Sequence, residues 1–133
     1  MKKFAQICLG AFGVLVFSNV VLAQDPFVVG PDVYKKLAFE NDRVRIAEIT
    51  FKPGDKIAMH SHPDHFIYVL SDGKLVLSYP DGTTKDFEGK AGDVAWIPAE
   101  SHAAQNVGTT EFKALVVELK EAPKTVSTGA VNP

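Results

Sequence analysis

The chain has 133 residues, a formal net charge of −2 and 46% hydrophobic residues. This length is sufficient for one domain with a buried core. The basic residues form no cluster and no RNA-binding signature is present, which argues against nucleic acid as a partner. A mildly acidic chain of this kind is expected to bind a small molecule instead.

Residues 1–23 have the pattern of a secretory signal peptide. The chain starts with two lysines, residues 4–22 are mostly apolar, and small residues at the right positions predict cleavage after Ala23. A retained membrane anchor is the alternative, since the apolar run is about long enough to span a bilayer. Cleavage would remove Lys2, Lys3 and Cys8, the only cysteine. The formal charge would then change from −2 to −4, and no thiol would remain. The mature protein is therefore expected in the periplasm or outside the cell, without membrane contact.

The rest of the chain predicts short strands separated by turns. Residues 25–32 read as a loop, and a break in the alternation of the second strand predicts a β-bulge near Ala47. No helical period of ten or more residues follows the signal peptide, so an all-β sandwich or barrel is expected over residues 24–120. The polar tail, residues 121–133, is expected to be disordered. The expected strands cover residues 33–39, 43–51, 56–62, 65–70, 74–79, 84–87, 94–97, 102–107 and 112–119.

The histidines form the most informative pattern in the chain. Three of the four fall within six positions, as His60, His62 and His65, and the fourth is His102. Successive side chains of a strand point to opposite faces, so His60 and His62 share one face. An antiparallel barrel can bring all four imidazoles together on one ion. Imidazole suits iron, manganese, zinc, nickel and copper, so the pattern predicts one divalent transition metal ion without choosing among them.

Two spaced patterns contain these histidines. The first is Gly54-x5-His60-x-His62 followed by Gly73, and the second is Gly92-x5-Pro98-x3-His102-x3-Asn106. They resemble the two motifs of the cupin superfamily, over about residues 40–119. The resemblance implies a single-domain double-stranded β-helix (jelly-roll) barrel, commonly a homodimer. It also implies a divalent metal held by two histidines and a glutamate of the first motif and a histidine of the second.

The resemblance assigns the three motif histidines, His60, His62 and His102, as metal ligands. The family's glutamate position falls on Phe66 or Ile67, neither of which can ligate a metal. Alignment on the strand that follows places His65 there instead. This predicts a four-histidine site.

Several other residues are candidates near this site. Glu100 stands where the second motif has a glycine, and it is a reserve ligand or an acid/base group. Tyr68, Trp96 and Asn106 are candidates for shaping the pocket, and Asn106 is also a candidate for structural hydrogen bonding. Tyr68 and Tyr79 are expected to pack in the barrel, and the alternative is that either hydroxyl reaches a cavity. Trp96 is expected either in the core or on the pocket wall.

The predicted function is a metal-dependent enzyme that acts on a small organic molecule. Dioxygenase-like chemistry is implied by the resemblance, and a Lewis-acid isomerase or hydrolase fits the predicted ligands equally well. Four neutral imidazoles would leave the ion its full charge, which makes it a stronger Lewis acid. The alternatives are a non-catalytic module that binds a metal or a small ligand and a purely structural barrel, because fold alone does not determine function. No catalytic group beyond the ligands is assigned.

Overall fold

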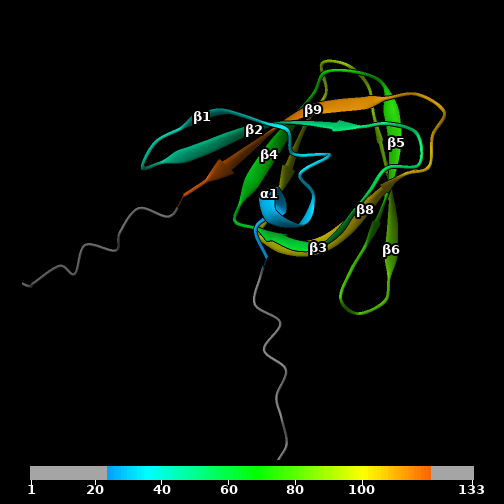
Figure 1. The fold of residues 1–133 in the computed structure, drawn as a ribbon, viewed down its shortest axis with the longest axis horizontal. Coiled ribbons are helices and arrows are strands. Elements are labelled where there is room, and N and C mark those ends of the chain that lie inside the picture. The colour runs from blue at the N-terminus through cyan, green and yellow to red at the C-terminus, as the bar shows by residue number, and fades with distance from the viewer. Residues whose placement is uncertain (1–23, 121–133) are drawn as a thin grey trace, which may run out of the picture.

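The computed structural model describes residues 24–120, and the predictions for residues 1–23 and 121–133 lie outside this range. Within it the chain forms a barrel of strands with a short helix packed against one side (Figure 1). No helix in this part of the chain is long and apolar enough to cross a membrane. The elements are α1 (Pro26–Val29), β1 (Lys36–Glu40), β2 (Val44–Phe51), β3 (Lys56–His62), β4 (His65–Val69), β5 (Gly73–Ser78), β6 (Thr84–Gly89), β7 (Val94–Ile97), β8 (Glu100–Asn106) and β9 (Phe112–Leu119).

The strands form two antiparallel sheets that enclose one core. The first sheet has the order β1-β2-β9-β4-β7, and the second has the order β3-β8-β5-β6. Most neighbours in these sheets are distant in sequence, as in the pairing of β2 with β9 and of β3 with β8. The expected all-β architecture is confirmed, and nearly all expected strands are found within a few residues of their predicted ends.

The core lies between the two sheets and follows from the alternation along each strand. In β5, Leu75 and Leu77 are buried while their neighbours are partly exposed. Phe112 at the start of β9 is 1% exposed and packs edge-on against Phe87, with ring centroids 5.9 Å apart. Burial of each large apolar side chain contributes about 1.5–3 kcal/mol. These side chains hold the two sheets, and hence their strand ends, at a defined separation.

The segment before the first strand differs from the predicted loop. Asp25 caps α1 through a 2.9 Å hydrogen bond from the Phe27 amide to its carboxylate, and Pro26 opens the helix. The strand expected from residue 33 begins only at Lys36, and the two residues predicted to start it, Val33 and Tyr34, are buried outside any strand. The segment packs against β3 and delivers Tyr34 into the barrel.

The close approach of this segment to β3 depends on Gly30. A Cβ atom at this position would lie 2.5 Å from Cγ1 of Ile57 and closer still to its Cδ1. Ile57 is 3% exposed and β-branched, so it has little room to move. We expect Gly30→Ala to cost about 1–3 kcal/mol and to lower the Tm by about 4–8 °C per kcal/mol. Thermal unfolding measures this effect. Asp32→Ala, at an exposed neighbour, is the control, and an equal Tm for the two variants would contradict the packing role of Gly30.

The predicted bulge lies on a different strand. The pairing of β2 with β9 is continuous, whereas the register with β1 shifts between Leu37 and Phe39. The extra residue is therefore on β1, opposite Ala47. The break in alternation has another cause: Ile46 belongs to the outer face, paired with Phe39, while Ala47 belongs to the core.

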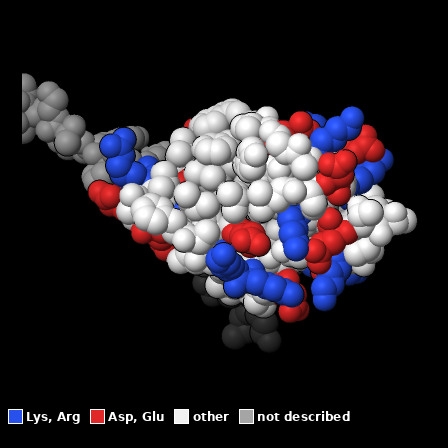
Figure 2. Space-filling model, turned by 90° about the horizontal axis from the view of Figure 1, so that it is seen from above, with Lys and Arg blue, Asp and Glu red and all other residues white. Residues whose placement is uncertain are grey.

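The outer face of the five-stranded sheet carries several exposed apolar side chains. Trp96 is 56% exposed and Tyr68 is 40% exposed, so neither lies in the core or the pocket. Both predictions were wrong because side chains alternate along a strand. Tyr68 points away from the face of Ile67 and Val69. Trp96 points away from the face of Ala95 and Ile97, which pack against the core. Figure 2 shows an area of one face with few charged side chains, surrounded by Lys, Arg, Asp and Glu that are most numerous at one end.

Candidate metal centre

Three of the four histidines inside the barrel come from β3 and β8, which are paired neighbours in one sheet. His60 and His62 project from β3, and His102 on β8 is the cross-strand partner of His60. A register shift on β3 between Ile57 and His60 adds one residue there. Without this bulge, residues three positions apart would point to opposite faces. With it, Ile57 packs in the core and both histidines still point inward.

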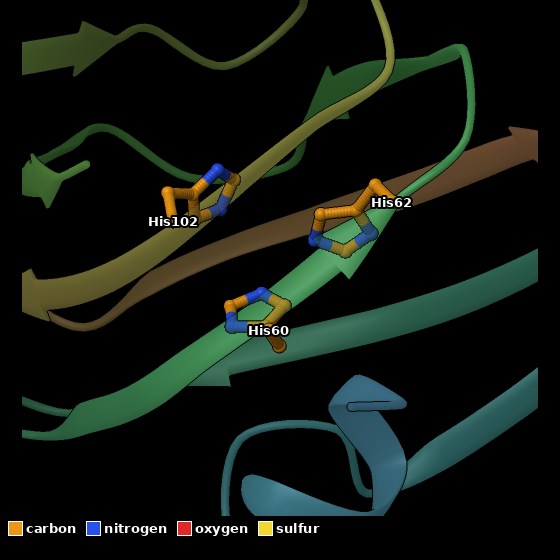
Figure 3. A group of neighbouring side chains, drawn as sticks. All are labelled: His60, His62 and His102. Carbon is orange, nitrogen blue, oxygen red and sulfur yellow. The ribbon is translucent and has the colours of Figure 1, made fainter. Parts of the chain in front are cut away.

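His60, His62 and His102 form a compact group, called here the three-histidine group. One nitrogen from each ring can be chosen so that all three lie within 4.8 Å of one another. Figure 3 shows the rings facing one another across the space between the strands. The ring centroids are 4.7 Å apart for His60 and His62, 4.9 Å for His60 and His102, and 5.3 Å for His62 and His102. All three side chains are buried.

The four histidines use the same ring nitrogen for hydrogen bonding. Each Nδ1 lies within 2.8 Å of a carbonyl or carboxylate oxygen, which can only accept, so each neutral ring carries its proton on Nδ1. Every Nε2 then keeps a free lone pair, which is the arrangement that metal-binding histidines require. The residues therefore fit a metal ion. The acceptors are the Ala58 carbonyl for His60, Glu118 for His62, the Pro63 carbonyl for His65 and Glu100 for His102.

His65 lies beside the three-histidine group without belonging to it. Its ring centroid is 4.6 Å from that of His62, and the side chain is 2% exposed. It starts β4 and lines the same cavity. Ligation by His65 stays a prediction.

The surroundings keep His60, His65 and His102 neutral. Burial, more than any other cause, lowers the pKa of His60 to about 4 and that of His102 to about 3. Charge on neighbouring imidazoles lowers both pKa values further. Burial also lowers the pKa of His65. At neutral pH these three rings are therefore uncharged, as metal binding requires.

Glu118 and Arg45, which the sequence patterns did not single out, support His62 on the Nδ1 side of its ring. The carboxylate of Glu118 accepts from Nδ1 of His62 at 2.6 Å and from Nε of Arg45 at 2.5 Å. Burial alone would raise the pKa of Glu118, but these two partners hold it at about 2. Arg45 also reaches the Asp25 carboxylate at 2.5 Å. One feature of the sequence could have identified Glu118: it is an acidic residue at an inward position of the otherwise apolar strand at residues 112–119.

Tyr34 covers the other side of His62. The two rings are stacked, with centroids 6.3 Å apart and an interplanar angle of 30°. The Tyr34 hydroxyl lies 3.4 Å from Nε2 of His62. Burial raises the pKa of Tyr34, so the hydroxyl keeps its proton. This residue was also missed, because it lies outside both motif patterns.

The remaining candidates occupy distinct places. Glu100 lies behind His102 and accepts its Nδ1 proton at 2.8 Å, so it orients the ring. Asn106 is a structural hydrogen-bonder whose amide donates to the carbonyls of Phe51 and Thr110 at 3.0 and 2.8 Å. Tyr79 packs inside, edge-on to His102, with ring centroids 6.4 Å apart.

The histidines open onto a small interior cavity of about 50 Å³. Its wall consists of the four imidazoles, Tyr34 and apolar side chains such as Ile49, Ile67 and Leu77. Among the described residues, no carboxylate or cation lines it. Such a space admits a molecule of only a few atoms, since a cavity of about 150 Å³ is needed to hold benzene.

The two antiparallel sheets form a small β-barrel, and its buried imidazoles lie close enough together to form a candidate metal site. Residues 47–118, more than half of the chain, match the family model of the cupin domain. The protein belongs to the cupin family, as the sequence motifs predicted. Its fold is the double-stranded β-helix barrel of that family.

Solved structures agree with this assignment. A cupin domain from Bordetella pertussis Tohama I is 27% identical with a TM-score of 0.60, over 65% of this chain and 91% of that one. A Klebsiella pneumoniae protein with a double-stranded β-helix domain is 28% identical with a TM-score of 0.53, over 66% of this chain and 77% of that one. A search of the curated proteins finds no match.

Proposed function

We propose that the protein is an exported, metal-dependent enzyme that acts on a small organic molecule. It binds one divalent transition metal ion through His60, His62 and His102, with His65 as the fourth ligand. The observation that carries the proposal is the shared orientation of the rings, each with its Nδ1 donating to an oxygen and its Nε2 free. The support for export is the leader pattern of residues 1–23.

The residues of the chain have separate roles in this proposal. The imidazoles hold the ion, and Glu118 and Glu100 keep two of them in the ligating tautomer. The apolar wall excludes water and limits the substrate to a few heavy atoms. A divalent ion held there would supply a Lewis acid or, for iron, manganese or copper, a redox centre.

A non-catalytic module that binds a metal or a small ligand is the second candidate. It is favoured by the cavity wall, on which the described residues place no carboxylate and no cation. Of residues 24–120, only the histidines and Tyr34 bring a proton-bearing side chain to this wall. A binding module needs no further acid or base, whereas an enzyme would have to draw on these groups.

Metal analysis of residues 24–133 beside a His102→Ala variant tests the proposal. After loading at neutral pH and desalting, we expect about one equivalent of a transition metal in the parent protein and less than about one tenth in the variant, because a three-nitrogen site loses a ligand. Gln105→Ala, at an exposed position of the same strand, is the matched control and should retain the metal.

The outcomes separate the candidates. If the parent protein holds no metal, the proposed function fails. Bound metal in both His102→Ala and the parent would contradict the ligand assignment. A His65→Ala variant that loads metal as well as the parent would reduce the site to three histidines. Bound metal together with turnover in a screen of small organic acids and enols supports the enzyme over the binding module.

A further inference from the structure

Tyr34 places a buried hydroxyl at the edge of the three-histidine group. The side chain is 6% exposed and packs against both β3 histidines. Its ring stacks on His62 and meets His60 edge-on, with centroids 6.1 Å apart. Phe27 of α1 packs against its other side at 5.3 Å, with the rings at 66°. The hydroxyl is thus fixed in place by aromatic packing from two elements.

The hydroxyl has one hydrogen-bond partner among residues 24–120, and that partner is a metal-ligand atom. It lies 3.4 Å from Nε2 of His62, a long contact for an O–H donor. Nδ1 of the same ring is already engaged by Glu118. A metal on Nε2 would use the lone pair that this contact needs. Loading the site therefore removes the only acceptor that residues 24–120 offer to this buried hydroxyl.

A buried hydroxyl without an acceptor is unfavourable, so the loaded site needs another group to accept its proton. The cavity wall around it is apolar apart from the imidazoles, whose Nε2 lone pairs a bound metal would occupy. No other acceptor for the hydroxyl is found among residues 24–120. Tyr34 and the histidines line the same cavity, so a small ligand there would lie near both the hydroxyl and a metal held by the rings.

We propose that Tyr34 donates a hydrogen bond to the metal-coordinating atom of the exogenous ligand and thereby selects small anions with an acceptor at that atom. Carboxylate and enolate oxygens belong to this class. The neutral imidazole ligands support it, since they leave the charge of the ion to be balanced by the ligand. The inference rests on the proposed metal site and adds a ligand-positioning residue to it.

Azide binding to the cobalt(II)-loaded protein tests this role. Azide is a small anion with an acceptor nitrogen, and its binding changes the visible absorption of cobalt(II). We expect Tyr34→Phe to bind azide about 5- to 10-fold more weakly than the parent, as the loss of one hydrogen bond predicts. The affinity for cobalt(II) without azide should not fall, because the hydroxyl is not a ligand and the variant has no hydroxyl that loses its acceptor on loading. Tyr68→Phe, which removes a hydroxyl from the outer face, should change neither value.

The result that overturns the inference is equal azide affinity in Tyr34→Phe and the parent, with cobalt(II) bound by both. If the parent itself binds no cobalt(II), the proposed metal site is wrong and this inference falls with it. Should Tyr34→Phe not fold, the parent protein supplies a second test. The infrared stretch of bound azide should shift when H2O is replaced by D2O, and an unchanged band would overturn the proposal.

Discussion

Acidification from pH 7 to pH 4 is expected to remove several kcal/mol of folding free energy from the metal-free protein. In the folded chain the pKa of His60 lies at about 4 and that of His102 at about 3, below the ordinary value of about 6.5. The unfolded chain therefore binds more protons as the pH falls. Stability is complete above about pH 6.5 and is lost as the pH falls toward the folded pKa values.

The size of this loss follows from about 1.4 kcal/mol per pKa unit. By pH 4, protonation of His60 and of His102 each removes about 3 kcal/mol, and the two losses are not additive because charge on neighbouring imidazoles, His62 among them, contributes to both shifts. Glu118 adds a further loss below its ordinary pKa of about 4.5, since its folded pKa is about 2.

Urea unfolding of the metal-free protein at pH 7, 5.5 and 4 measures this dependence. His102→Asn is the control, because the variant has one fewer group to protonate and should lose less stability between pH 6.5 and 4. A constant free energy of unfolding over this range in the parent protein would show that the histidines are not held neutral by burial.

Glu118→Gln is expected to weaken both the fold and the metal site. Glu118 is 4% exposed and pairs with Arg45 and His62, so loss of its charge leaves a partly buried guanidinium without its main partner. We expect a loss of about 3 kcal/mol in stability, which is typical of a broken buried pair. Metal affinity should fall about 10- to 100-fold, because the carboxylate orients the His62 ring and holds its proton on Nδ1.

Chemical denaturation and a metal competition titration measure these two effects. The matched control is Glu111→Gln, which breaks the exposed ion pair with Lys113 and should cost less than about 0.5 kcal/mol. If Glu118→Gln and Glu111→Gln have the same metal affinity as the parent, the carboxylate does not support His62.

The sequence was sufficient to predict the barrel and the three-histidine group. Strand alternation and turn residues predicted nearly all strands, and the positions of His60 and His62 two residues apart on one strand predicted a shared face, which is confirmed. The partnership with His102 came from the resemblance of the motifs. The register of β3 with β8 then brings the rings together across a bulge that the sequence did not reveal.

The residues that support the histidines could not be predicted in this way. Tyr34 and Glu118 lie 28 and 56 positions from His62. Their contacts depend on which strands pair and on the path of the segment before β1, and periodicity carries no information on either. The same limit explains Trp96, whose aromatic character suggested burial although its position in β7 places it outside.

The composition of the cavity wall has a consequence for how the ion is chosen. The wall offers nitrogen donors, and among the described residues it offers neither sulfur nor acidic oxygen. Nitrogen sites follow the general affinity order of divalent ions, in which manganese binds weakly and copper most tightly. Selection among these ions then depends on their abundance where the chain folds. Protein produced in two compartments, or in two media of different trace-metal content, is expected to carry different ions in the same barrel.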